Sequence, residues 1–344
     1  MSTGIKTAKK KEKGNKKMKI IKLFKLAAVS ALTITMITGC GGQNNEDLKE
    51  VAIIQYVEHT SLDTIKKAFD KQMEELGYKQ GENINYTFKN AQGDSNTAPS
   101  IIQGFQSGKK DCVVAIATPV AMSAAVMAKN TPVVFAAVTD PISAGLTSSL
   151  EKPDKNITGT SDEIQVEKIL EKALEINPEL KTLGVIYNKA EVNSVTNIEK
   201  AKSFCDKNNI SLVEGTITAV NEVQSAIDVL ASKSDAIFAP NDNMVASAMD
   251  MVSTACAKAK VPLYVGADSM VQDGGFLSVG INYDDLGKET ANMVDKILKG
   301  EKVENIPVKI FKDDLSIYVN KKILSELGIT LPDSIKKDKA YIEM

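Results

Sequence analysis

Two stretches share one plan: Asp111-Cys112-Val113-Val114-Ala115-Ile116-Ala117-Thr118-Pro119 and Asp235-Ala236-Ile237-Phe238-Ala239-Pro240-Asn241. In each, an acidic residue precedes a short apolar run of the kind found in buried parallel strands, and an alanine- and methionine-rich segment follows. Each segment then leads through a proline to another apolar run, at residues 133–138 in the first copy and 263–265 in the second. The repetition predicts two similar lobes of alternating strands and helices.

The alternation extends outward from both stretches and restarts after a connecting segment at residues 155–160. Further strands are predicted at residues 51–57, 84–88, 183–187, 211–214 and 277–281. Helices are predicted at residues 97–107, 120–129, 163–176, 194–208, 221–231 and 242–258, with another from Leu62 that stops at Gly77. We therefore expect an α/β fold of two Rossmann-like, doubly wound lobes joined by a hinge. Open sheets of this kind bind ligands at the carboxyl ends of their strands, so facing lobes would enclose one cleft.

The boundaries of the two lobes follow from the same pattern. We expect residues 51–159 plus 285–311 to form an N-terminal lobe, and residues 160–284 plus 312–335 to form a C-terminal lobe. The chain should cross between the lobes near residues 159–161, 282–285 and 311–314. The last residues, 336–344, are either a frayed end or a final strand.

Residues 1–39 have the features of a signal peptide of the lipoprotein type. A lysine-rich stretch precedes an apolar run at residues 26–37, which suits a signal-peptide core and is too short to span a bilayer. Small residues then lead to Cys40, and residues 40–50 form a polar tether. We expect Cys40 to be lipidated and to anchor the protein on the extracellular face of the cytoplasmic membrane. An ordinary signal peptide and an uncleaved membrane-surface helix are the alternatives.

Charge and composition limit the partners of the protein and the ways in which it can hold them. Ten of the 42 lysines and one of the 44 acids lie in residues 1–39, which leaves a net charge near −11 for the rest. So acidic a surface argues against nucleic acid as a partner. The chain contains neither arginine nor tryptophan. An acidic ligand group must therefore be held by backbone N–H groups, hydroxyls, amides or lysine, because a bidentate guanidinium contact is impossible.

The cysteines and the single histidine argue against a metal site, a cofactor and an enzyme. Cys112, Cys205 and Cys256 form no C-x-x-C pair and are expected to be buried fillers. His59 has no second histidine and no nucleophile-elbow or H-E-x-x-H pattern around it. We expect His59 to shape the mouth of the cleft and to give ligand binding some pH sensitivity.

Several short motifs resemble one known family in their order and spacing. They are Val57-Glu58-His59-Thr60-Ser61-Leu62-Asp63, Ala117-Thr118-Pro119, Val133-Val134-Phe135-Ala136-Ala137-Val138-Thr139-Asp140-Pro141, Asn156-Ile157-Thr158-Gly159, Asn188 with Asn193-Ser194, and Asp284-Asp285-Leu286-Gly287. The chain resembles the ABC-transporter substrate-binding lipoproteins of the tryptophan/tyrosine type, within the class I periplasmic-binding-protein fold. Members of that family usually carry proline at the position of Thr60 and alanine at that of Ser61.

The resemblance implies capture of an aromatic amino acid, with tyrosine favoured over tryptophan and phenylalanine. The bound ligand would be delivered to an ABC permease with its ATPase, both separate chains. A sugar or nucleoside on the same fold is the alternative ligand class, although sugar sites commonly use arginine and tryptophan. Contact with a host surface, as an adhesin or antigen, is a possible additional role.

The carboxylate of such a ligand needs hydrogen-bond donors. Thr118, next to Pro119 in its motif, opens a helix after a strand and can offer its hydroxyl and the following N–H groups. Thr139 and Ser194 are similar candidates at strand ends. The competing interpretation of each is ordinary helix capping.

The ammonium group needs an anionic acceptor. The candidates are Asp242, Asp268, Asp140 and Glu58, each expected just past the carboxyl end of a strand. Helix capping is the competing role of Asp242.

The remaining candidates concern the bridge between lobes and the ligand ring. Asn188, Asn193 and Asn241 are suited to hydrogen bonds between the lobes, or else to shaping turns. Tyr56 and Tyr187, at the ends of the first strands of the two lobes, are either walls that stack on the ligand ring or core aromatics.

Overall fold

The structure is a computed structural model that describes residues 48–311 and 315–344. The expected signal peptide, the lipidation site at Cys40 and most of the tether lie outside the described residues. Within the described part of the chain, no helix is long and apolar enough to cross a membrane.

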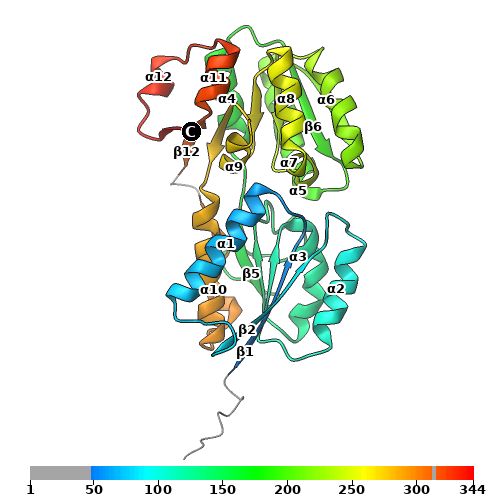
Figure 1. The fold of residues 1–344 in the computed structure, drawn as a ribbon, viewed down its shortest axis with the longest axis vertical. Coiled ribbons are helices and arrows are strands. Elements are labelled where there is room, and N and C mark those ends of the chain that lie inside the picture. Colours follow the sequence, from blue (N-terminus) through cyan, green and yellow to red (C-terminus); the bar gives the residue numbers. More distant parts are fainter. Residues whose placement is uncertain (1–47, 312–314) are drawn as a thin grey trace, which may run out of the picture. The chain divides into compact units, whose positions relative to one another are not determined.

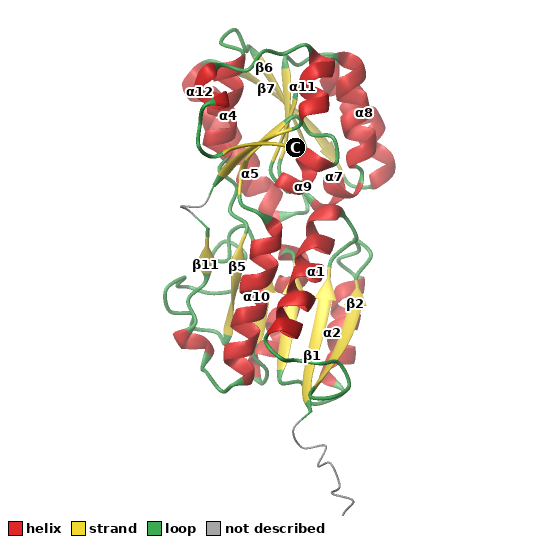
Figure 2. Ribbon diagram, turned by 60° about the vertical axis from the view of Figure 1, so that its left-hand side comes forward, coloured by secondary structure: helices red, strands yellow, loops and turns green. Residues whose placement is uncertain are grey.

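The first of two sheets forms what we call the N-terminal lobe, and all its strands are parallel (Figures 1 and 2). Its strand order is β11-β5-β4-β3-β1-β2. The strands are β1 (Lys49–Gln55), β2 (Ile84–Asn90), β3 (Cys112–Ile116), β4 (Val133–Ala136), β5 (Ile157–Ser161) and β11 (Lys309–Ile310). Helices α1 (Thr60–Glu75) and α10 (Tyr283–Leu298) pack together on one face, and α2 (Thr97–Gln106) and α3 (Thr118–Ala124) cover the other.

The second sheet forms the C-terminal lobe, in the order β13-β12-β10-β9-β8-β6-β7. Only the β10–β12 pair is antiparallel. The strands are β6 (Thr182–Asn188), β7 (Ser211–Ile217), β8 (Ala236–Ala239), β9 (Leu263–Val265), β10 (Leu277–Gly280), β12 (Ser316–Val319) and β13 (Tyr341–Glu343). The helices are α4 (Val166–Ile176), α5 (Val192–Asn208), α6 (Val223–Ala231), α7 (Asn243–Ser247), α8 (Met249–Ala259), α9 (Asp268–Gln272), α11 (Lys321–Leu327) and α12 (Asp333–Lys336).

The apolar runs form strands whose side chains are buried between the helices on the two faces of each sheet. All five residues of β3 are fully buried, as expected for a central parallel strand with helices on both faces. One apolar cluster fills the N-terminal lobe and continues under α6 and α8, and a second fills the opposite face of the C-terminal sheet under α4 and α5. Cys112, Cys205 and Cys256 are free and buried in these clusters, which confirms their role as fillers.

Two glycines set close backbone contacts in the N-terminal lobe. A Cβ at Gly287 would lie 2.4 Å from the carbonyl oxygen of Ile65, so α10 can pack against α1 at this distance only with glycine. A Cβ at Gly159 would lie 2.0 Å from the carbonyl oxygen of Phe135, so β5 can pair this closely with β4 only if the residue is glycine. Both glycines belong to motifs singled out in the sequence.

The predicted fold class is confirmed: two parallel-dominated α/β sheets carry helices on their faces. The connecting segment predicted at residues 155–160 is corrected, because residues 157–161 form strand β5. This strand was missed since its residues are mostly polar. They are nevertheless buried and hydrogen-bonded, Thr158 to Ile306 O at 2.7 Å and Thr160 to Thr290 at 2.9 Å. The chain passes between the two sheets after β5, between β10 and α10, and between β11 and β12.

Candidate functional site

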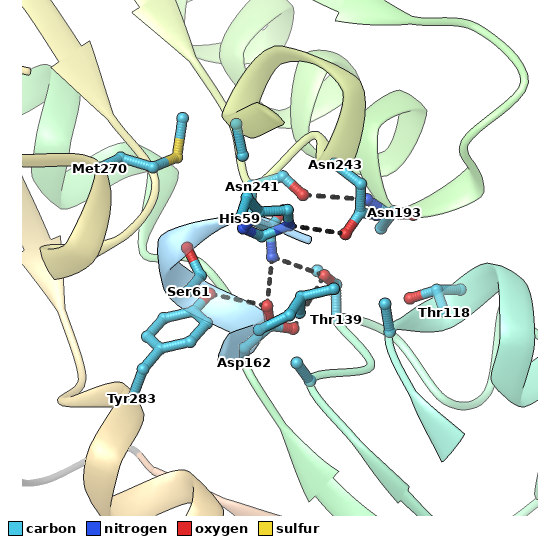
Figure 3. Close-up of a pocket in the computed structure, with 14 residues that line it drawn as sticks. His59, Ser61, Thr118, Thr139, Asp162, Asn193, Asn241, Asn243, Met270 and Tyr283 are labelled. Carbon is cyan, nitrogen blue, oxygen red and sulfur yellow. Dashed lines mark hydrogen bonds between the residues drawn. The ribbon is translucent and has the colours of Figure 1, made fainter. Parts of the chain in front are cut away.

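A small cavity lies where the two lobes meet (Figure 3). It is lined by His59, Ser61, Leu62, Ala117, Thr118, Ala137, Thr139, Asp162, Asn193, Asn241, Asn243, Ala246, Met270 and Tyr283. These residues follow the carboxyl ends of parallel strands or begin the next helix, which is where open α/β sheets bind ligands. The cavity has a volume of about 10 Å³, which is room for one water.

Two strand ends at the cavity have unusual backbone conformations. Ala117, after β3, has φ 91°, and Ala137, after β4, has φ 54°. Residues other than glycine seldom adopt positive φ, and such strain tends to collect at functional sites. Both alanines line the cavity, so these turns give the site a small, fixed wall on the side of the N-terminal lobe.

Asp162 is the centre of the polar network. Its Oδ1 accepts from Thr139 Oγ1 at 3.0 Å, and its Oδ2 accepts from Asn241 Nδ2 at 2.6 Å and from Tyr283 Oη at 2.8 Å. Thr139 follows β4, Asn241 follows β8 and Tyr283 opens α10, so the carboxylate joins donors from both lobes. Burial raises the pKa of Asp162, and the three hydrogen bonds act in the opposite direction.

A second carboxylate network lies behind the cavity in the C-terminal lobe. Asp242 caps α7 by accepting from Val245 N, and it also accepts from Asn188 N at 2.7 Å and Ser194 Oγ at 2.6 Å. Burial raises the pKa of Asp242 against these hydrogen bonds. The network therefore holds the turn after β8 against the start of α5.

Glu191 is the neighbouring buried acid. Its Oε2 accepts from Asn243 Nδ2 at 2.5 Å and from Asn193 Nδ2 at 3.2 Å. Burial, and then the nearby charge of Asp242, raise the pKa of Glu191. Glu191 therefore positions two amides that line the cavity without lining it itself.

His59 reaches across the boundary between the lobes. Its Nε2 lies 3.3 Å from Asn243 Oδ1 on α7, and its Nδ1 is buried without a hydrogen-bond partner among the described residues. Burial lowers the pKa of His59 to about 4, against smaller opposing effects of Asn243 and Asp63. The ring is therefore neutral near neutral pH.

A separate contact between the lobes lies at the start of α1. Thr60 Oγ1 donates to Asp273 Oδ1 at 3.0 Å, and the hydroxyls of Ser61 and Ser269 are 2.6 Å apart. Asp273 and Ser269 belong to α9 and its end, in the C-terminal lobe. We call these four residues the α1–α9 contact. Thr60, Ser269 and Asp273 do not line the cavity.

The structure brings five of the sequence-predicted residues together around the cavity: His59, Thr118, Thr139, Asn193 and Asn241. Asn188, Ser194 and Asp242 lie one layer behind, in the network described above. The other predicted residues do not line the cavity: Tyr56, Glu58, Pro119, Asp140, Tyr187 and Asp268.

The residues outside the cavity have local partners. The hydroxyl of Tyr56 donates to Gly93 O at 2.8 Å, and that of Tyr187 donates to Glu214 at 2.6 Å, so both are buried aromatics with satisfied hydroxyls. Asp140 accepts from Ser143 N and Oγ in its own turn. Asp268 accepts from Ser269 N, and burial raises its pKa to about 6. Glu58 lies in a separate surface groove beside Phe88.

Sequence reasoning missed nine cavity residues: Ser61, Leu62, Ala117, Ala137, Asp162, Asn243, Ala246, Met270 and Tyr283. Asp162 directly follows β5, and Tyr283 opens α10, neither of which was predicted as an element. A buried strand of threonine and serine gives no apolar signal. The available signal was Gly159, because a glycine between threonines marks a close backbone approach. Within the described ranges, no group of three or more metal-ligating side chains is arranged around a common point.

Comparisons with known proteins give one family and several similar proteins. The sequence model of a family described as ABC transporter substrate binding protein matches residues 50–341. A tyrosine-binding protein from Clostridioides difficile strain R20291 is 40% identical over 281 residues, 82% of this chain and 81% of that protein. Members of this family bind substrates and are not enzymes.

Two solved structures are similar along almost their whole length. One is an ABC domain from Streptococcus pneumonia in complex with L-Trp, with a TM-score of 0.81 and 36% identity, covering 86% of this chain and 99% of that chain. The other is the ligand-free, open structure of a substrate binding protein with adhesive properties from Clostridium difficile. Its TM-score is 0.64 at 42% identity, with the same coverage of both chains.

Proposed function

This chain belongs to the family of ABC transporter substrate-binding proteins, and from that premise we propose that it captures an aromatic amino acid between its two lobes. Tyrosine is the favoured ligand, followed by tryptophan and phenylalanine. The observation that carries the proposal is the similarity, over most of the chain, to one protein named for tyrosine binding and to another in complex with L-Trp.

The chemistry of the cavity supports an amino acid. Its lining contains one carboxylate, Asp162, and three side-chain amides, but no lysine. The hydroxyl of Thr118 makes no hydrogen bond to any other described residue, so it remains available to a ligand carboxylate. Leu62, Ala246 and Met270 provide apolar surface for a ring. A carboxylate, amides and apolar side chains around one cavity suit an aromatic amino acid.

We propose that capture works by hinge closure. Sites for small ligands usually measure about 300–1,000 Å³, far more than this cavity, so the lobes must part for a ligand to enter. At similar identity, the TM-score is higher with the L-Trp complex than with the open, ligand-free protein. That difference supports a closed arrangement here. A ligand held between the lobes would stabilise a similar arrangement, opened enough to contain it, in proportion to its contacts with both lobes.

The wider role follows from the family. Substrate-binding proteins of ABC transporters work outside the cytoplasm, and we propose that this one delivers its ligand to a permease with its ATPase. Cys40 is our proposed lipidation site and would keep the protein on the extracellular face of the cytoplasmic membrane. Mass spectrometry of the membrane-extracted protein tests this, because a diacylated N-terminal peptide must begin at Cys40.

Thermal melting tests the ligand class. The full chain, unfolded and refolded in mild detergent to remove carried-over ligand, would be melted with each amino acid and with a panel of sugars and nucleosides. A ligand at 100 times its Kd adds about 2.7 kcal/mol of stability, a shift of several degrees. We expect the shift with tyrosine, or with the aromatic amino acids alone. A shift with a sugar or nucleoside would retain the fold and overturn the ligand.

Surface adhesion is a second candidate role. The observation that favours it is the similar Clostridium difficile protein described as having adhesive properties. Cell-binding assays with wild-type protein and a variant that cannot bind ligand would separate this role from transport, because adhesion should survive the loss of ligand binding.

A further inference from the structure

We propose that Asp162 is the residue that receives the ammonium group of the ligand. The inference rests on the proposed function, because it assumes that the ligand is an amino acid, and it assigns the specificity of that site to one side chain. Asp162 is the only carboxylate among the residues that line the cavity.

The hydrogen bonds of Asp162 leave one position open. An ionised carboxylate can accept about four hydrogen bonds, two at each oxygen. Oδ2 already accepts two, from Asn241 and Tyr283, whereas Oδ1 accepts one, from Thr139. The remaining position on Oδ1 is available to a further donor, and an ammonium group is a donor that also carries charge.

Asp162 is a buried carboxylate without a cationic partner among the described residues. Asp162 is 6% exposed, and among the described residues no lysine lies within ion-pair distance of its carboxylate. The chain has no arginine to serve instead. Burial without a cation raises the pKa of Asp162, because the charged form loses its hydration. A ligand ammonium would provide the missing countercharge from inside the cavity.

A second unsatisfied acceptor lies at the same cavity. Asn193 Oδ1 is buried and has no donor among the described residues, although Asn193 Nδ2 donates to Asn241 O at 3.2 Å. Asn241 therefore hydrogen-bonds both to Asn193 and to Asp162. An ammonium group has three N–H donors, more than Asp162 alone can use, and Asn193 offers a further acceptor from the C-terminal lobe.

The position of Asp162 connects recognition to closure. It follows β5, where the chain leaves the N-terminal lobe, and its donors come from both lobes. An ammonium group bound there lowers the cost of burying the carboxylate only when the lobes enclose it. Ligands without an ammonium group should therefore fail to hold the lobes together, even when they carry the same ring.

The absence of tryptophan from the protein allows a direct test. Selective excitation of an indole reports the ligand alone, because the full chain contributes no tryptophan emission. The titration compares L-tryptophan with indole-3-propionate, which differs by the missing ammonium group. Both ligands are titrated into wild-type protein, into Asp162→Asn, and into Asp295→Asn as a buried control carboxylate outside the cavity.

We expect wild-type protein and Asp295→Asn to prefer L-tryptophan strongly over indole-3-propionate. In Asp162→Asn, the Kd for L-tryptophan should rise at least about 30-fold, because loss of one partner of a buried charge pair is costly. The Kd for indole-3-propionate should change little. The preference of wild-type protein is a separate readout that does not depend on how well the variant folds.

The outcomes distinguish this inference from the proposed function. If wild-type protein binds L-tryptophan but does not prefer it over indole-3-propionate, or if Asp162→Asn retains the preference, the assignment of Asp162 is overturned and the ligand class stands. If wild-type protein binds no aromatic amino acid, the proposed function itself fails. A melting temperature of Asp162→Asn close to that of wild-type protein establishes that the variant is folded.

Discussion

The side-chain amide of Asn241 joins the two lobes through one nitrogen, which lies 2.6 Å from Asp162 Oδ2 and 2.9 Å from Thr139 Oγ1. Replacing Asn241 by leucine keeps a similar volume and leaves a buried carboxylate with one donor fewer, a loss of about 1–3 kcal/mol. We predict at least a fivefold rise in the ligand Kd, measured by indole fluorescence. Asn208→Ala, at the far end of α5, is the control and should bind like wild-type protein. Equal Kd values for both variants would show that the bridge does not contribute to capture.

The Thr60–Asp273 hydrogen bond of the α1–α9 contact should favour the closed state from outside the cavity. Asp273→Leu removes the acceptor of Thr60, whereas Asp273→Asn keeps a side-chain oxygen at the same place. A hydrogen bond of this kind contributes about 0.5–1.5 kcal/mol, so the leucine variant should bind ligand roughly two- to tenfold more weakly. The asparagine variant should stay close to wild-type protein. Identical behaviour of the two variants would assign no role to this hydrogen bond.

His59 should make binding weaker at acid pH. In the closed state burial lowers its pKa to about 4, whereas an opened cleft should return it towards the ordinary value near 6.5. Protons therefore favour the open state, and binding strength is lost as the pH falls below about 6.5. The linkage predicts a Kd about tenfold higher at about pH 5.5 than at about pH 7.5.

The control for this pH effect is His59→Gln, which can still donate to Asn243 but does not titrate. The groups that face the ring are Asp63 on α1 and Asn243 on α7, with Glu191 behind Asn243. The Kd of the glutamine variant should vary much less over the same range. If its pH profile matches that of wild-type protein, another group is responsible.

Glu191 should stabilise the folded protein more at acid pH than at alkaline pH. Its pKa is raised in the folded protein, so the folded state binds this proton more tightly than the unfolded chain. The contribution is present below the ordinary carboxyl pKa and is lost as the pH rises through the raised value. Glu191→Gln keeps an acceptor for Asn243, and its melting temperature should fall less than that of wild-type protein between about pH 5.5 and 8.5. Parallel melting curves would contradict this.

Alanine substitutions at Gly287 and Gly104 should change the stability of the protein in opposite directions. Alanine at Gly287 would place its Cβ 2.4 Å from the backbone of α1 and should destabilise the protein by at least about 2 kcal/mol. Alanine at Gly104, in α2, meets nothing within 4 Å and should stabilise by about 0.5–1 kcal/mol. Chemical denaturation measures both changes. A stable Gly287→Ala variant would show that the two helices can move apart without cost.

The fold was predictable because its strands are apolar and β-branched, and its helices recur between them. Runs such as β3 and β8 have one interpretation in an alternating α/β pattern. β5 was not predictable in this way, because its buried threonines gain their stability from specific hydrogen bonds that no periodicity reveals. Asp162 was missed for the same reason, since it was not recognised as the residue after a strand.

The site shows a further limit of sequence patterns. A polar residue after a strand can point into a cavity, as Thr139 and Asn241 do, or cap the next turn, as Asp140 does. The sequence signal is the same in both cases, and only the path of the chain after the strand decides between them. Ser61 and Met270 reach the cavity because α1 and α9 meet there, which depends on how the two lobes contact each other.

The most direct measurement of the central claim is the emission of L-tryptophan when it is titrated into the refolded, ligand-free protein, followed by competition with L-tyrosine. The account predicts a saturable blue shift as the indole is buried between the lobes, and complete reversal by L-tyrosine but not by a sugar. Unchanged indole emission, in a protein whose melting temperature is raised by a sugar or nucleoside, would contradict it.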